Sequence, residues 1–182
     1  MGNTIKSTNK TNKVTLKITI THQYTIKCSY IDSNKKETII QLHNHIKQKD
    51  GWYPLNISFT NTDIIICQDD ENTIPFIQDL FSNPHEFKMY EINYQEKEYN
   101  VISEVLFALL INEFKEQIEK EYIITKTIIE LPIINPTVNA RILTSLDAIG
   151  LKEIELDEEE IEYEYKEQGD VLEEIRERKR EY

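Results

Sequence analysis

The order of the hydrophobic periods constrains this 182-residue chain most, because strand-like patterns come first and helix-like patterns follow. The first pattern alternates apolar residues with Thr and Lys: Val14, Leu16, Ile18 and Ile20. A period of two predicts a half-buried strand. A second strand is expected at about 24–31 and, after the turn-forming residues 32–35, a third at 38–42. Three strands in succession predict an antiparallel meander.

The middle of the chain alternates between short apolar runs and turn residues. A loop is expected around Gly51 and Pro54. Strands are then expected at 55–59 and 64–67, a short helix at 73–81, and a hairpin formed by 87–92 and 97–100.

Helical spacing becomes clear after Ser103, which we expect to cap a helix. The apolar positions of this helix are Val105, Leu106, Leu109, Leu110, Phe114 and Ile118. Residues 125–131 are strand-like and stop at Pro132. Asn135 and Pro136 then open a second helix, which ends at Gly150, and one more strand is expected at 151–156. A β-meander followed by helix–strand–helix–strand predicts an α/β fold with a mixed sheet.

Composition and charge together indicate three regions in the chain. Residues 1–12 are expected to be a flexible polar arm, 13–157 the folded lobe, and 158–182 an acidic and largely helical appendage. The net charge is −12, but it is +7 over residues 1–49 and −8 over 152–182. Solvated surface explains this asymmetry most simply, and docking of one end on the other or on a charged partner is the alternative. Nucleic-acid binding is not expected, because an acidic body repels phosphates.

Composition excludes several classes of protein. With four glycines and no G-x-G-x-x-G or G-x-x-x-x-G-K motif, a self-sufficient nucleotide enzyme is disfavoured. No apolar run reaches the roughly 18 residues of a membrane span, and the polar start is not a secretory signal. Two cysteines cannot form a disulfide framework, so a reducing, cytoplasmic location is expected.

A set of short matches in a fixed order covers residues 14 to about 165. They are Glu37-Thr38-Ile39-Ile40, Asp50-Gly51, Pro54, Phe59-Thr60-Asn61-Thr62, Asn72-Thr73-Ile74, Thr127 to Pro132 and Ala148-Ile149-Gly150-Leu151. This ordered set resembles the first lobe of the nucleotide-binding domain of the seventy-kilodalton heat-shock chaperones. The resemblance implies a single actin-like, ribonuclease-H-like lobe.

The departures from that family concern its ATP site. The family's first phosphate loop reads D-L-G-T-T, and the corresponding residues here are Thr21-His22-Gln23-Tyr24-Thr25. Only Thr25 matches, and Tyr24 is expected to crowd the phosphate position. The family's acid in N-E-P-T corresponds to Glu159, without the Pro, and the stretch expected to hold the family's catalytic Lys contains Glu71 instead.

These departures imply a vestigial nucleotide site made of Tyr24, Thr25 and Glu159, with no catalytic residue and no metal ligand. The family's second phosphate loop and second lobe would lie beyond Tyr182, so we do not expect this chain alone to hydrolyse ATP. ATP with magnesium is the cofactor that the resemblance suggests, and no cofactor is the expectation.

Three functions remain open on these grounds. The first is a truncated, heat-shock-chaperone-like module that hydrolyses nothing and binds or regulates chaperones or co-chaperones. The second is an ATP-binding chaperone component that pairs with a partner supplying the missing lobe. The third is an interaction protein that acts through its acidic tail.

Four other features suggest sites, each with a simpler explanation. His43 and His45 share one face if they lie on a strand, but no further metal ligand is evident, so surface histidines are expected. Cys28 with His22 could form a nucleophile and base, but Cys28 is expected in the core. The acids at 157–160 could bind a hard cation, but a solvated face is expected. Gly2 lies in a near-match to an N-myristoylation motif, but Lys6 stands where the motif requires Ser or Thr and Ser7 is one place late, so an unmodified Gly2 is expected.

Overall fold

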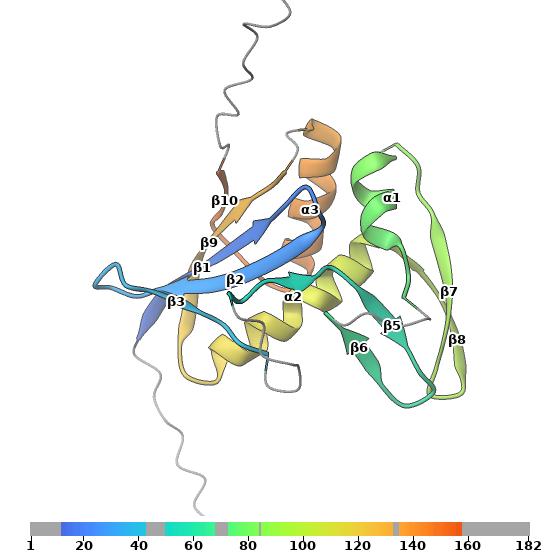
Figure 1. Cartoon of the computed structure of the whole chain (residues 1–182), viewed down its shortest axis with the longest axis horizontal. Helices are drawn as coiled ribbons and strands as arrows, with labels where there is room; N and C mark the ends of the chain where they lie inside the picture. The colour runs from blue at the N-terminus through green and yellow to red at the C-terminus, as the bar shows by residue number, and fades with distance from the viewer. Residues whose placement is uncertain (1–11, 43–49, 68–72, 84, 133–134, 158–182) are drawn as a thin grey trace, which may run out of the picture.

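The computed structural model describes residues 12–42, 50–67, 73–83, 85–132 and 135–157 (Figure 1). Its main sheet contains β1 (Lys13–Ile20), β2 (Thr25–Ile31), β3 (Glu37–Ile39), β9 (Ile123–Glu130) and β10 (Ile154–Asp157). The strand order is β10-β9-β1-β2-β3. β1, β2 and β3 pair antiparallel, as the meander predicted, whereas β9 pairs parallel with both β1 and β10. The protein is therefore α/β with a mixed sheet.

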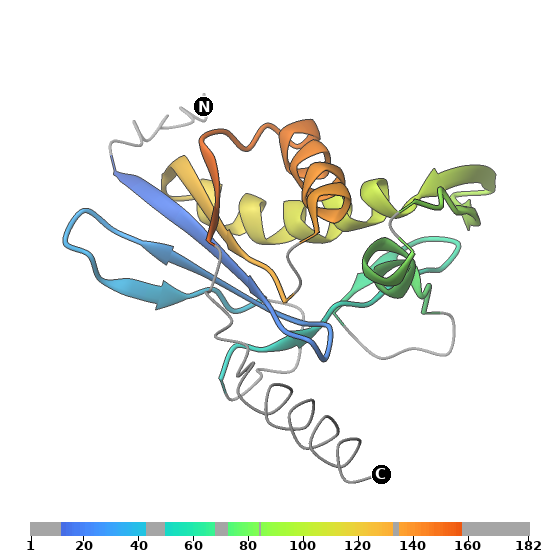
Figure 2. The same ribbon diagram turned by 90° about the horizontal axis from the view of Figure 1, so that it is seen from above.

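Two helices connect the parallel strands and cover one face of the sheet. They are α2 (Ser103–Glu119) and α3 (Pro136–Ala148), and both lie on the same side of the strands (Figure 2). The alternation in β1 explains this arrangement: Leu16 and Ile18 are fully buried toward the helices, whereas Lys17 and Thr19 are only partly buried on the opposite face. Apolar residues on α2, such as Leu106 and Phe114, complete the core.

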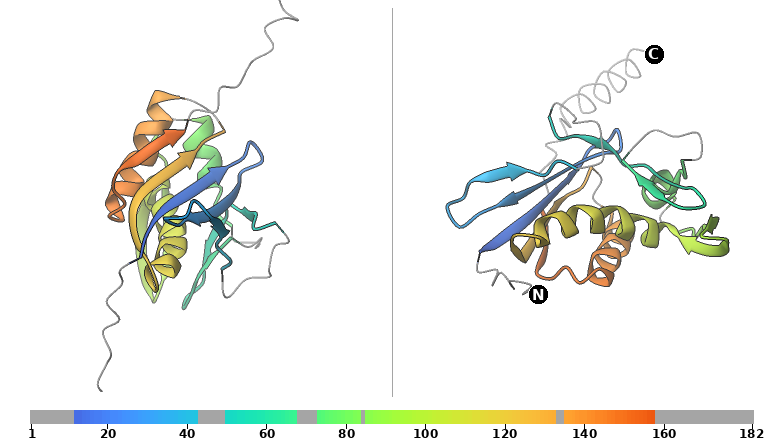
Figure 3. Two further views of the ribbon diagram at one scale, coloured as in Figure 1. Left: turned by 90° about the vertical axis from the view of Figure 1, so that its left-hand side faces the viewer. Right: turned by 90° about the horizontal axis from the view of Figure 1, so that it is seen from below.

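A smaller group of elements lies between β3 and α2 in sequence and beside one end of the sheet in space (Figures 1 and 3). It contains the hairpin of β5 (Ile57–Phe59) and β6 (Ile64–Ile66), the short helix α1 (Phe76–Ser82), and the hairpin of β7 (Met89–Tyr94) and β8 (Lys97–Ile102). Phe76 and Leu80 of α1 are fully buried and belong to the same core cluster as the sheet residues. The two groups of elements therefore share one hydrophobic core.

The structure differs from expectation at β4 (Tyr53–Pro54), a region predicted to be a loop. The third strand is shorter than predicted, so β3 pairs with only residues 29–31 of β2. This leaves the first part of β2 free at that edge, and β4 pairs there with Thr25 and Ile26. A proline is tolerated because β4 lies at the edge of the sheet, where its missing N–H costs no ladder bond.

The two long helices begin in different ways. Asn135 caps α3, because its side-chain oxygen accepts hydrogen bonds from the amides of Thr137 and Val138. The prediction that Ser103 caps α2 is wrong. Ser103 is already the first helical residue and is fully buried, while Ile102, at the end of β8, occupies the cap position without any side-chain hydrogen bond. Strand β8 thus runs directly into the helix.

None of the helices in the described ranges combines the length and the apolar character needed to cross a bilayer.

Candidate functional site

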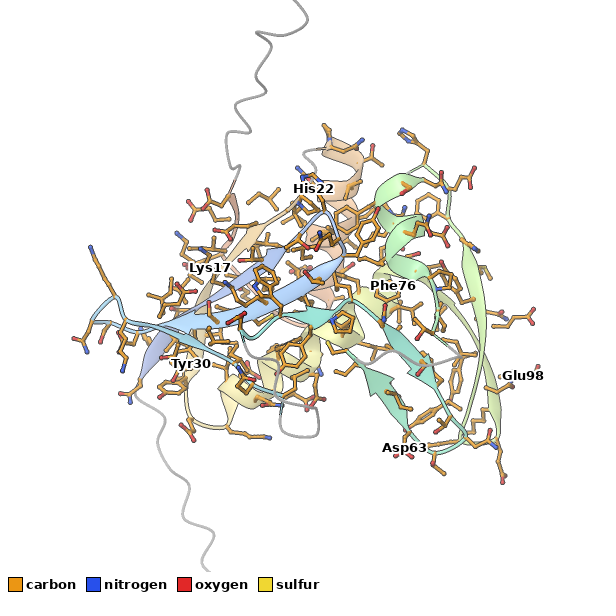
Figure 4. All side chains as sticks on the ribbon, viewed as in Figure 1. Lys17, His22, Tyr30, Asp63, Phe76 and Glu98 are labelled. Atoms are coloured by element: carbon orange, nitrogen blue, oxygen red, sulfur yellow. The ribbon has the colours of Figure 1, made fainter. Side chains whose placement is uncertain are left out.

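The carboxyl ends of the three parallel strands β1, β9 and β10 meet at one edge of the sheet, which is where α/β sheets commonly bind ligands. A pocket of about 220 Å³ lies at this edge. Its lining comes from the end of β1 and the turn after it (Thr19, Ile20, Thr21, His22) and from the end of β9 and the segment after it (Glu130, Leu131, Pro132). Figure 4 labels His22 in this turn. The β1–β2 turn is also the segment that corresponds to a phosphate loop in the resemblance.

The β1–β2 turn satisfies its own hydrogen-bonding groups. The hydroxyl of Thr21 accepts hydrogen bonds from the amides of Gln23 and Thr25, both at 3.3 Å, and lies 2.7 Å from the hydroxyl of Thr25. The Thr21 amide donates to the Thr25 carbonyl, and the Tyr24 amide donates to the Thr21 carbonyl. A phosphate loop needs amides that are directed at the anion. Four amides of this turn are instead bonded within it.

Tyr24 holds the turn to its neighbours rather than lining the pocket. Its φ of 54° is in the left-handed region, which is uncommon for a residue other than glycine. Its carbonyl accepts a hydrogen bond from the Leu55 amide. Its ring lies 6.0 Å from the ring of Phe81 on α1, and its hydroxyl is 3.5 Å from that of Ser82. Tyr24 therefore ties the turn to α1.

A carboxylate that the sequence analysis did not single out lies in the pocket wall. Glu130 is the last residue of β9, and its two oxygens contact the ammonium of Lys17 at 2.6 Å and the hydroxyl of Thr19 at 2.6 Å. Lys17, labelled in Figure 4, and Thr19 share the open face of β1. Thr19 lies opposite Glu130 in the strand register. Strand alternation places the two β1 residues on one face, but only the pairing of β1 with β9 brings Glu130 to them.

Glu130 is held in its charged form. Burial alone would raise its pKa, but hydrogen bonds from Lys17 and Thr19, together with the charges of Lys17 and Lys27, outweigh burial and keep the pKa below its ordinary value. The same contact raises the pKa of Lys17. A permanent negative charge in the pocket wall repels phosphate oxygens, and the nearest ammonium is already paired with it.

The remaining predicted site residues lie in different places. Thr25 begins β2, where its hydroxyl bonds to Thr21. Glu159, like Glu71, the His43 and His45 pair, Gly2 and the acids at 158–160, lies outside the described residues. Asp157 ends β10 and lies opposite Glu130 in register. In the described part of the chain, no group of three or more His, Cys, Asp or Glu residues is arranged to hold a metal ion.

Cys28 and His22, the suggested nucleophile and base, do not form an accessible site together. Cys28 is on β2 and fully buried, as the core prediction required, and burial raises the pKa of its thiol well above the ordinary value. His22 is exposed in the turn. A buried neutral thiol is a poor nucleophile, so Cys28 serves as a core residue.

In comparisons with known proteins, no protein-family model and no curated protein matches the chain.

Proposed function

We propose that this chain is a single actin-like lobe of the heat-shock-chaperone type that has lost nucleotide binding and acts as a binding or regulatory module toward chaperones or co-chaperones. The sheet supports the fold assignment, since an antiparallel meander is followed by helix–strand–helix–strand in the expected order. The elements from β5 to β8 are then an insertion in that lobe, placed between the third meander strand and the first crossover helix.

The observation that carries the loss of nucleotide binding is the closed β1–β2 turn. Its amides and the hydroxyls of Thr21 and Thr25 bond to one another, so they are not free to hold a phosphate. The charged Glu130 beside them adds repulsion. Both features act at the position where a triphosphate would enter.

Calorimetric titration of the full chain with magnesium ATP tests this part of the proposal. We expect no measurable heat of binding at concentrations where an intact chaperone of the family, used as the positive control, is saturated. A dissociation constant in the micromolar range, about 8 kcal/mol of binding free energy, would contradict the proposal.

The regulatory part is tested with an intact chaperone and its co-chaperone. We expect added chain to reduce the co-chaperone-stimulated ATPase rate in a saturable manner while the basal rate stays unchanged, because the module competes for the co-chaperone. The matched control is Leu106→Asp, which places a charge at a fully buried core position and unfolds the lobe. Equal inhibition by this variant, or none by the folded chain at large excess, would exclude competition by a folded lobe.

A further inference from the structure

A second pocket lies at the opposite end of the sheet from the β1–β2 turn and has a volume of about 540 Å³. This volume is within the range of roughly 300–1,000 Å³ typical of small-molecule sites. It forms because the helical layer ends before the sheet does. α2 stops at Glu119, whereas the β2–β3 hairpin continues past it (Figure 1). Tyr30 pairs with the buried Leu16 in the strand register, so both residues lie on the sheet face that α2 covers. Because Tyr30 lies beyond the end of α2, it is only partly buried.

One wall of this pocket is a pair of tyrosines from segments far apart in sequence. The rings of Tyr30 on β2 and Tyr122, just before β9, lie 4.8 Å apart with an interplanar angle of 35°. The Tyr30 hydroxyl donates to the Tyr122 hydroxyl at 3.4 Å. Because Tyr122 accepts this hydrogen bond, its own hydroxyl proton can be donated to a ligand. The wall therefore offers both aromatic surface and a hydroxyl donor.

Another part of the lining is the β2–β3 turn, whose own hydrogen bonds fix its shape. The carboxylate of Asp32 accepts hydrogen bonds from the amides of Asn34 at 2.8 Å and Lys36 at 3.0 Å. The Asp32 amide in turn donates to the Lys36 carbonyl. Asp32 is the only acid among the described residues that line the pocket, and its carboxylate is bonded to backbone amides. Lys13 and Lys36 also line the pocket, and both are exposed. Two lysines and one acid therefore line this pocket, in a chain whose net charge is −12.

We propose that this pocket binds a small aromatic anion, with its charged group between Lys13 and Lys36 and its ring against Tyr30 and Tyr122. A flat ring packs well against tyrosine, and a lysine ammonium donates charge-assisted hydrogen bonds to a carboxylate or a phosphate. The inference does not depend on the proposed chaperone-related function, because it concerns the other end of the sheet.

Nuclear magnetic resonance titration of the ¹⁵N-labelled full chain with phenyl phosphate tests the proposal. We expect saturable shifts of the amides of Tyr30, Asn34, Lys36 and Tyr122. Inorganic phosphate supplies the anion alone and phenol supplies the ring alone, and each should bind more weakly than phenyl phosphate. Phenol binding as tightly as phenyl phosphate would overturn the anionic part, and shifts that do not saturate would overturn the site.

Two charge reversals locate the binding. Lys36→Glu should weaken phenyl phosphate about tenfold, because it removes one charge-assisted contact and adds repulsion. Lys97→Glu is the matched control: it reverses another exposed lysine, at the start of β8, which does not line the pocket. Both positions are exposed, so the circular dichroism spectra should stay unchanged. Equal affinity in the Lys36 variant and the wild type, or equal weakening in both variants, would overturn the assignment.

Discussion

Glu130 joins two strands whose pairing residues are far apart in the chain. Its bond to the Thr19 hydroxyl spans 111 positions, and its ion pair with Lys17 lies on the open face of the sheet with both side chains partly shielded from water. A shielded carboxylate that accepts two hydrogen bonds contributes more than an exposed ion pair, because water competes less for its oxygens.

Replacement of Glu130 by Gln should lower the free energy of unfolding at pH 7 by about 1–2 kcal/mol, because a charged acceptor is lost. The matched control is Glu155→Gln. It removes the pairing with Lys126 on the same sheet face, where both side chains are more exposed, and it should cost less. Urea denaturation measures both. Equal losses in the two variants would mean that shielding of Glu130 contributes nothing.

The pH dependence of stability follows from the same group. The pKa of Glu130 is lower in the folded protein than its ordinary value of 4.5, so its contribution is complete above that value. It is lost as pH falls through the folded pKa, since the protonated carboxyl no longer pairs with Lys17. In urea titrations from pH 6 down to pH 3, the wild type should lose more stability than Glu130→Gln. Parallel pH profiles would contradict this assignment.

Among the elements, α3 has a defined start that one side chain controls. Asn135→Ala removes the oxygen that accepts hydrogen bonds from Thr137 and Val138, and it should destabilise the protein by about 1 kcal/mol. Asn135→Ser is the conservative control, because serine keeps an acceptor at the cap position and should stay close to wild type. Thermal unfolding followed by circular dichroism compares the two. A serine variant as unstable as the alanine variant would show that capping is not the cause.

The two long helices are joined by a buried ion pair. The guanidinium of Arg141 on α3 donates to Glu104 on α2 at 2.5 Å, and both side chains are less than a tenth exposed. Arg141 also contacts the Glu86 carbonyl and lies over the ring of Phe87. The pair therefore links both helices to the segment that enters β7.

Removing one partner of this pair should be costly, because it leaves a charge buried. Glu104→Gln is expected to lower the free energy of unfolding by about 3–5 kcal/mol, and Arg141→Met by a similar amount. The double variant should lose much less than the sum of the single losses. A double-mutant cycle in urea measures the coupling, and strictly additive losses would contradict a direct interaction.

Sequence periodicity predicted most elements, because each period reports which local face is buried. The alternation that ends at Ile20 predicted β1, and Asn135 with Pro136 predicted the start of α3. Periodicity did not predict β4, because β4 forms only where β3 leaves an edge of β2 unpaired. It also did not predict the contact of Lys17 with Glu130, since that contact depends on the register between β1 and β9. Contacts set by pairing between distant segments have no local signal.

At the scale of the whole molecule, one core joins the sheet to the elements from β5 to β8. Cys28 on β2 and Cys67 after β6 both belong to it, and both are buried. Burial raises the pKa of each thiol well above its ordinary value. Neither thiol should therefore react while the protein is folded.

Reaction with Ellman's reagent can then report whether the molecule opens as a single unit. With single-thiol variants Cys28→Ala and Cys67→Ala, we expect both remaining cysteines to be unreactive at pH 8 without denaturant. In urea, both should react at the same rate, because the shared core couples the two regions. Faster reaction at Cys67 would show that the β5–β8 region opens separately.

The position of β1 in the sheet also has a consequence for the time course of folding. On one side β1 pairs with β2, which follows after a short turn, and this hairpin can close within microseconds. On its other side β1 pairs with β9, which lies more than a hundred residues further along the chain. During synthesis at about 5–20 residues per second, one edge of β1 therefore stays unpaired for several seconds after the hairpin has formed. An exposed apolar strand edge can pair with other chains, so the nascent protein has its greatest need of protection in that interval.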